Sequence, residues 1–224
     1  MKPIHAKSFI ALACAMSTTG CIPMIWAASS HGVHGSGRPA QETRKVIGDF
    51  SKVSEDGAVN VAIRVGDKTS VTVEGDDNIV PLVKTSVQDN TLYIETKKSI
   101  RPKQKLLVTI TMPRLDGIQL DGAGNVTAKD VKSDALKVGL DGAGNIDISG
   151  TASSLTATLD GAGNITLTDL QVKNADVTVD GAGNLDLWAT DSLKAALNGV
   201  GNIHYKGSPK VQKEVNGVGR ITSG

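Results

Sequence analysis

Hydrophobic and polar residues alternate along most of the chain. Val59, Val61 and Ile63 show this alternation in the first half, and residues 136–140 show it in the second half. A period of two over four to six residues is typical of β-strands that bury one face. The spacing of amphipathic helices is missing from residues 116–224. The pattern therefore predicts an all-β fold.

A five-residue motif, Asp-Gly-Ala-Gly-Asn, recurs at nearly constant spacing in the second half. Its first copy spans residues 121–125, and the six copies start 20, 19, 20, 18 and 18 residues apart. The last two copies, 198–202 and 216–220, have Asn in the first position and Val in the third. Antiparallel hairpins would alternate their turns between two sides, whereas a coil that returns to one corner uses one motif per coil. We therefore predict a parallel β-helix with 18–20 residues per coil.

The motif residues have distinct predicted roles at this corner. The glycines allow positive φ or close approach of the backbone. The asparagines are expected to stack as an amide ladder along the axis. The aspartates form a second column, in which each carboxylate accepts hydrogen bonds from the glycine amides of its own bend. The residues concerned are Asp121, Gly122, Gly124, Asn125, Asp141, Gly142, Gly144, Asn145, Asp160, Gly161, Gly163, Asn164, Asp180, Gly181, Gly183 and Asn184.

The aspartate column raises the alternative of bound Ca²⁺. Carboxylates on stacked coils, about 4.8 Å apart, repel one another, and a cation would relieve that repulsion. The last two copies carry Asn198 and Asn216 instead, which cap a turn without charge. We therefore favour structural capping, and we predict no cofactor and no metal site, with Ca²⁺ as the alternative.

The N-terminal segment, residues 1–28, has the features of an export signal. Lys2 and Lys7 precede an apolar run at 8–16, which is too short for a transmembrane helix. Ordinary cleavage and lipoprotein processing at Cys21 are the two alternatives. Because both cysteines lie in or at the end of the signal, no disulfide is expected in the exported chain. We expect a protein of the bacterial periplasm, outer membrane or cell surface.

The rest of the chain divides into a linker and one domain. Residues 29–45 are rich in Ser, Gly and His, which predicts a flexible linker. The domain spans residues 46–224. Within it, residues 46–115 keep the alternation but lack the motif, which predicts irregular early coils that cap the regular coils at 116–224.

The overall charge indicates little about a partner. The formal net charge is +1, which favours neither nucleic acid nor an anionic membrane, and we predict no nucleic-acid partner. Residues 97–105 are the exception, since they hold five cations in nine residues. A solvated loop is the preferred interpretation, and contact with anionic lipid or glycan is the alternative.

Several landmarks resemble a known bacterial family. They are Phe-Ser-Lys-Val at 50–53, Val-Thr-Val-Glu-Gly-Asp-Asp-Asn at 71–78, Leu-Tyr-Ile at 92–94, and the repeated Gly-Ala-Gly-Asn. In this order they are similar to the head GIN domain proteins, also called auto-transporter adhesins, and the resemblance covers residues 46–224. It implies an exported, right-handed β-helix with an adhesin-like role. It carries over no catalytic or binding residue.

Catalytic motifs are missing from the sequence. The exported part has no Gly-x-Ser-x-Gly, no His-Glu-x-x-His, no phosphate-binding loop and no cysteine nucleophile. Polysaccharide-cleaving β-helices need paired carboxylates, or acids with a base, gathered on one face. No such group interrupts the regular repeats, so we predict that the chain is not an enzyme. A polysaccharide-active enzyme is the least favoured alternative.

Strand register predicts a binding surface around one tryptophan. Counting outward positions from each Asn places Trp188 beside Asp186, Thr168 and His204 on a flat β face. An aromatic ring with polar neighbours suits a carbohydrate, or a protein partner of the envelope or host. We therefore expect a binding or adhesin-like protein. The alternative is an envelope scaffold, in which the open C-terminal coil pairs with a second copy to form a homo-oligomer.

Overall fold

The computed structural model describes residues 32–224, so the predicted signal peptide and Cys21 lie outside the described residues. The fold is 70% strand, with a 3₁₀ turn, η1, at Val80–Leu82. None of the described residues forms a helix long and apolar enough to cross a membrane. The strands are β1 (Val33–His34), β2 (Pro39–Arg44), β3 (Lys52–Asp56), β4 (Asn60–Val65), β5 (Ser70–Asp76), β6 (Val83–Gln88), β7 (Thr91–Thr96), β8 (Ile100–Arg101), β9 (Leu107–Met112), β10 (Gly117–Leu120), β11 (Asn125–Leu140), β12 (Ala143–Leu159), β13 (Ala162–Val179), β14 (Ala182–Leu197), β15 (Val200–Lys206), β16 (Lys210–Val215) and β17 (Val218–Ser223).

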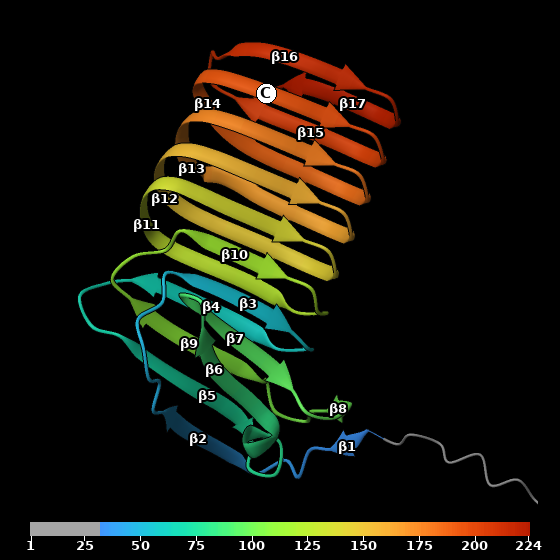
Figure 1. Ribbon diagram of the computed structural model, residues 1–224. Helices are drawn as coiled ribbons and strands as arrows, with labels where there is room; N and C mark the ends of the chain where they lie inside the picture. The colour runs from blue at the N-terminus through green and yellow to red at the C-terminus, as the bar shows by residue number, and fades with distance from the viewer. Residues whose placement is uncertain (1–31) are drawn as a thin grey trace, which may run out of the picture. The chain divides into compact units, whose positions relative to one another are not determined.

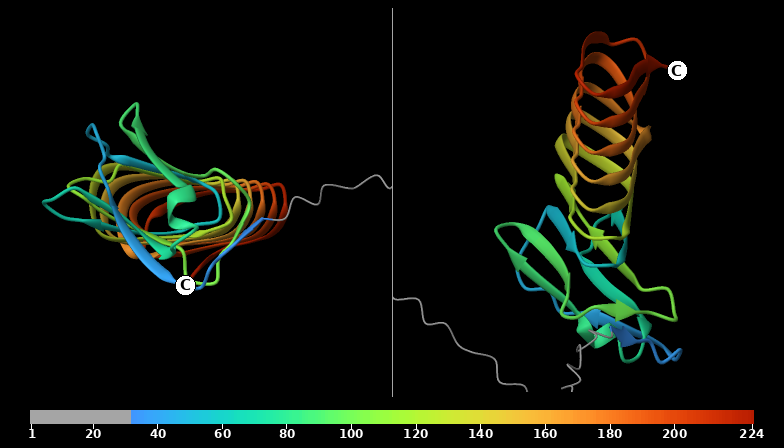
Figure 2. Two further views of the ribbon diagram at one scale, coloured as in Figure 1. Left: turned by 90° about the horizontal axis from the view of Figure 1, so that it is seen from below. Right: turned by 90° about the vertical axis from the view of Figure 1, so that its right-hand side faces the viewer.

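Four long strands, β11 to β14, each make most of one coil. Every one pairs in parallel with the next, and the parallel ladder continues through β10 to β3 and through β15 to β17. Figure 1 shows these coils stacked along one axis, and Figure 2 shows them end-on as elongated loops. The fold is a β-solenoid of about five turns, which confirms the predicted parallel β-helix.

Equivalent residues of successive coils lie directly above one another. Asn125 is in register with Asn145, and Leu140 with Leu159, and the later coils continue these registers. Alternate side chains enter the interior, where Leu140, Ile146 and Leu159 are at most 1% exposed. Because aliphatic side chains of similar shape stack in each column, the core fills without large aromatic rings.

The strands before β10 form less regular coils. β4 pairs in parallel with both β9 and β11, so the parallel ladder already begins in this region. β5 pairs antiparallel with β2 and β9, and β6 forms an antiparallel hairpin with β7. These antiparallel strands lie at the N-terminal end of the coil stack (Figure 1).

The prediction of a flexible linker at 29–45 is wrong for the strands within it. β2 pairs with β5 along its whole length, from Pro39 opposite Asp76 to Arg44 opposite Val71. β1 pairs in parallel with β8. β2 has mainly exposed side chains, so this strand shows no alternation of hydrophobic residues. Backbone hydrogen bonds to β5 hold the strand along its length, and composition does not reveal them.

Asp76 joins the loop between β1 and β2 to the loop that follows β8. Its buried carboxylate accepts hydrogen bonds from the backbone N–H groups of Gly37 at 2.6 Å, Lys103 at 2.8 Å and Gln104 at 3.0 Å. Burial by itself raises the pKa of Asp76, but the three N–H donors outweigh it, so the pKa lies below its ordinary value. The two loops are therefore fixed to each other through one ionised side chain.

Candidate functional site

The Asp-Gly-Ala-Gly-Asn motifs form one corner of the solenoid, with the geometry of the predicted amide ladder. Asn145 Nδ2 donates to Asn125 Oδ1 at 2.8 Å. The ladder extends one coil further than the motif, because Asn125 Nδ2 donates to Asn60 Oδ1 at 2.9 Å. On the later coils, each motif asparagine likewise donates to the motif asparagine of the preceding coil. The distances are 3.0 Å for Asn164, 3.0 Å for Asn184 and 3.1 Å for Asn202.

The glycines allow the coils to approach closely at this corner. A Cβ at Gly144 would overlap the carbonyl oxygen of Gly124, and a Cβ at Gly161 would overlap that of Gly142. No other residue type fits without moving the backbone of the neighbouring coil. The motif is thus explained by packing of backbone against backbone.

The aspartates do not accept hydrogen bonds from the glycine amides of their own bends, and that prediction is wrong. The amides donate to the preceding coil instead: Gly142 N–H bonds to the Leu120 carbonyl at 3.2 Å, and Gly161 N–H bonds to the Leu140 carbonyl at 3.0 Å. Because the parallel ladder continues through the corner, the amide of the first glycine in each bend already has a backbone partner on the preceding coil.

The aspartate column is a line of mutual repulsion. The pKa of Asp160 is raised by desolvation, then by the charges of Asp180 and Asp141 on the adjacent coils. Further along, Asn198 Nδ2 relieves this by donating to Asp180 Oδ1 at 2.6 Å. Among residues 32–224, no group of three or more His, Cys, Asp or Glu side chains is placed to hold a metal ion.

Trp188, predicted to be an exposed ring, is half-buried. Lys206 is in register with it on the next coil, and the ammonium nitrogen lies 4.4 Å from the centre of the ring. Asp186 is in register with His204, whose Nδ1 lies 2.7 Å from Oγ1 of Thr222. A cation therefore covers part of the ring, which leaves less of it for a sugar than the sequence suggested.

Thr168 is not in register with Trp188, although the count by two predicted it to be. The register of β13 with β14 shifts between Leu167 and Gln171, so Gln171 is the residue opposite Trp188. Coils of 20 and 18 residues meet here, and the extra residues of the longer coil form a bulge. Counting by two from the motif fails wherever such a bulge intervenes.

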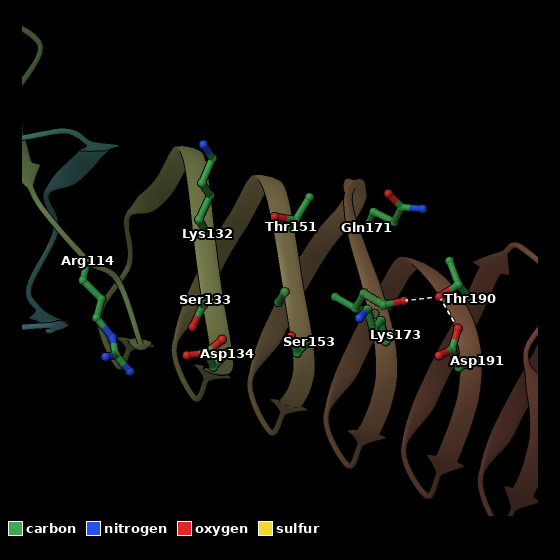
Figure 3. Close-up of a pocket in the computed structure, with 12 residues that line it drawn as sticks. Arg114, Lys132, Ser133, Asp134, Thr151, Ser153, Gln171, Lys173, Thr190 and Asp191 are labelled. Atoms are coloured by element: carbon green, nitrogen blue, oxygen red, sulfur yellow. Dashed lines mark hydrogen bonds between the residues drawn. The ribbon is translucent and has the colours of Figure 1, made fainter.

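A groove of about 520 Å³ crosses four coils at the corner that lacks the motif. Its first row holds Lys132, Thr151 and Gln171, which are in register, and Figure 3 shows their side chains on successive coils. Trp188 continues this row on the next coil. The groove was not predicted from the sequence, although Trp188 continues the register of its first row.

The second row of the groove carries charges and a hydroxyl group. Between the rows, Ala152 and Val172 are buried against the core. Within the groove, the Thr190 hydroxyl is hydrogen-bonded to the Val172 carbonyl and to Asp191 (Figure 3), and Ser133 Oγ donates to Asp116 Oδ1. The side chains of Lys132, Thr151, Ser153, Gln171 and Lys173 have no hydrogen-bond partner among residues 32–224, so they remain available to a ligand. The second row consists of Asp134, Ser153, Lys173 and Asp191.

The charges of the groove balance one another. Arg114, at one end, donates from Nε to Asp116 Oδ1 at 2.6 Å, and this hydrogen bond and the charge of Asp116 raise the pKa of the guanidinium. The remaining cations, Lys132 and Lys173, are matched by the two carboxylates of the second row. Such a surface suits an uncharged ligand with many hydroxyl groups better than a strongly charged one.

Glu55 is a buried acid that was not predicted from the sequence. It is in register with Leu120 and occupies an inward column that leucines fill in later coils. Its Oε1 accepts a hydrogen bond from the Val59 N–H at 3.1 Å, and its Oε2 has no partner among the described residues. Burial, followed by the charges of Asp56 and Asp121, raises the pKa of Glu55 to about 7. Alternation from Val53 was the signal that placed Glu55 inward.

Comparison with known proteins identifies one protein family and several similar crystal structures. The family described as "Putative auto-transporter adhesin, head GIN domain" matches residues 49–209. A crystal structure of a "putative adhesin" from Bacteroides fragilis has 30% sequence identity and a TM-score of 0.71, over 86% of this chain and 100% of that one.

Two further crystal structures are similar in fold alone. A "putative lipid binding protein" from Parabacteroides distasonis is 23% identical with a TM-score of 0.55, and the match covers 87% of this chain and 100% of that one. A "putative adhesin" from Parabacteroides merdae is 22% identical with a TM-score of 0.52, over 86% of this chain and 99% of that one. No match was found among the curated proteins.

Proposed function

The chain belongs to the head GIN domain family of auto-transporter adhesins, and from this we propose that it is an exported, adhesin-like protein of the cell envelope that binds its target without catalysis. The groove at the motif-free corner is its binding surface. The target is an extended, uncharged polyhydroxylated chain, such as a neutral glycan of the envelope or host.

The regular spacing of polar groups along the groove is the observation that carries this proposal. Thr151 and Gln171 occupy equivalent positions on adjacent coils, and Ser153 faces the same groove from the second row. Stacked coils repeat about every 4.8 Å, so the four coils present polar groups over about 14 Å. A linear oligosaccharide can contact several coils at once, and many weak hydrogen bonds then add up to useful affinity.

The same spacing argues against glycoside hydrolysis in the groove. Asp134 and Asp191 stand on coils three steps apart, or about 14 Å along the axis. The two carboxylates of glycosidases are about 5–9.5 Å apart, since both must reach one bond of the substrate. Binding is therefore the function that the groove supports best.

Two bulky substitutions on one coil test the groove. Ser153→Trp fills it, whereas Thr156→Trp places the same ring on an exposed position three residues away. The processed wild-type protein and both variants are applied to a glycan and extracellular-matrix array, in calcium and in EDTA. Circular dichroism and thermal melting check that each variant is folded.

We expect the wild type and Thr156→Trp to bind neutral glycans with similar affinity. The affinity of Ser153→Trp for these glycans should be at least tenfold lower. Retained binding by Ser153→Trp would assign the interaction to another surface. A wild-type protein that binds nothing on the array in either buffer would contradict the adhesin-like function. In that case a role as an envelope scaffold is favoured, and a measurement of the protein's oligomeric state tests that role.

A further inference from the structure

The loop around β8 is a cluster of unpaired cations. Five Lys and Arg side chains fall within nine residues, and all of them are exposed. None of the five forms an ion pair with an acid among residues 32–224. We name this surface the basic loop, and its cations are Lys97, Lys98, Arg101, Lys103 and Lys105.

The backbone of the basic loop is held in place. β8 pairs in parallel with β1, and the Asp76 carboxylate accepts hydrogen bonds from the backbone N–H groups of Lys103 and Gln104. These bonds fix the loop while leaving its cationic side chains in solvent. The charges therefore form a preorganised surface rather than a mobile tail.

The basic loop lies beside β1, the first strand of the described residues. Val33 N–H donates to the Ser99 carbonyl at 2.8 Å, and Gly35 N–H donates to the Arg101 carbonyl at 2.9 Å. Figure 1 shows β1 and β8 side by side at the N-terminal end, away from the stack of regular coils. Any membrane attachment that acts through the segment before Gly32 would bring this loop toward the lipid.

Charge is segregated along the solenoid. Residues 32–115 contain 13 Lys and Arg against 10 Asp and Glu, a net charge of +3, whereas residues 116–224 contain 9 against 13, a net charge of −4. The near-zero total thus conceals a positive N-terminal end and a negative body. An anionic surface would attract the first and repel the second, which orients the axis away from that surface.

We propose that the basic loop docks the N-terminal end of the domain on an anionic lipid surface and holds the solenoid upright, with the groove in solution. The inference uses the export part of the proposed function and is independent of what the groove binds. Anionic head groups attract clustered Lys and Arg within a Debye length, so the contact is sensitive to salt.

Vesicle co-sedimentation of the processed protein tests this docking. Vesicles of phosphatidylcholine are compared with vesicles that contain 30% phosphatidylglycerol, in low and in physiological salt. In the test variant Lys97, Lys98, Lys103 and Lys105 are changed to Gln. The matched control changes four exposed lysines of the coils, Lys129, Lys137, Lys194 and Lys210, to Gln. A lipid anchor would contribute equally to all samples, so the difference between vesicles isolates charge.

The wild type and the coil control should bind anionic vesicles at least tenfold better than neutral ones, with the preference falling as salt rises. The loop variant should lose most of this preference while melting at an unchanged temperature. Equal binding to both vesicle types, or an equal loss in the coil control, would overturn the proposal. Binding to soluble dextran sulfate without binding to anionic vesicles would also overturn it. The array result for neutral glycans leaves this outcome unaffected, so the two proposals fail separately.

Discussion

The ammonium group of Lys213 donates a hydrogen bond to the backbone carbonyl of Ile221, 3.0 Å away, across the last coil. Lys213 is in register with Ala195 and therefore occupies an inward column at the C-terminal end. The ammonium nitrogen also lies 4.9 Å from the centre of the Tyr205 ring. An inward-pointing charge on an end strand is a recognised means of blocking strand addition.

Lys213→Leu should therefore permit end-to-end association. The substitution continues the aliphatic column and leaves the strand edge open to a second copy. Size-exclusion chromatography with light scattering, over a hundredfold range of concentration, should show dimers or larger species. Gln212→Leu is the control and should remain monomeric, because Gln212 is in register with the exposed Lys194 and so lies on the outward face of the same strand. A wild type that is itself oligomeric, and unchanged by Lys213→Leu, would instead favour the scaffold alternative.

Glu55→Gln should change how stability depends on pH. Below about pH 4.5 the carboxyl is protonated in both states. In the wild type the pKa of Glu55 is raised from 4.5 to about 7 in the fold, so the unfolded chain loses this proton first as pH rises. The wild type's free energy of unfolding should therefore fall by up to about 3 kcal/mol between about pH 4.5 and pH 7, and it should stay lower above pH 7.

Gln keeps an acceptor for the Val59 N–H and carries no charge. The variant should be more stable than the wild type by about 1–3 kcal/mol at pH 8 and about equal to it at pH 4. Urea unfolding at several pH values measures both. Asp147→Asn, at an exposed position, is the control for loss of one negative charge. A difference between wild type and Glu55→Gln that does not vary with pH would rule out titration of this group.

The regular coils were predictable because each coil repeats the same physical problem. Gly161 is required because its backbone closely approaches the preceding coil, and Asn145 is required because its side-chain amide donates to Asn125 on the preceding coil. The repeated motif therefore predicts which residues of successive coils are in register. The bulge that puts Gln171 rather than Thr168 in register with Trp188 was not predictable, because a bulge depends on the different lengths of two adjacent coils.

The candidate site was less predictable than the fold for a related reason. The groove exists only after Lys132, Thr151 and Gln171 are aligned by coils of unequal length, and no short motif marks that alignment. β2 was missed because an edge strand held by backbone bonds shows no hydrophobic alternation. The role given to the aspartates was wrong because the glycine amides bond to the preceding coil.

Asp160→Asn should stabilise the protein above the pKa of this carboxyl. Its pKa is raised in the fold, so ionisation costs stability as pH rises from the unfolded value of 3.8 through the folded value. Because the side chain is exposed, the gain should be only about 0.5 kcal/mol at pH 7. A later coil already carries an Asn at the equivalent position, because Asn198 stands there and donates a hydrogen bond to Asp180. Melting curves in calcium and in EDTA measure the effect, and a loss of stability confined to calcium would restore the cation alternative.

Gly161→Val should be strongly destabilising, whereas Ala162→Val should be tolerated. A Cβ at Gly161 would overlap the Gly142 carbonyl oxygen of the preceding coil, and the strand ladder prevents the backbone from retreating. We expect a loss of about 3 kcal/mol or more, measured by urea unfolding. Ala162 is exposed at the same corner, and the chain itself carries Val200 and Val218 at the equivalent position. Comparing the two variants therefore distinguishes a clash with the backbone of the preceding coil from a general intolerance of larger side chains in the motif. Similar losses of stability in both variants would contradict the proposed backbone contact at Gly161.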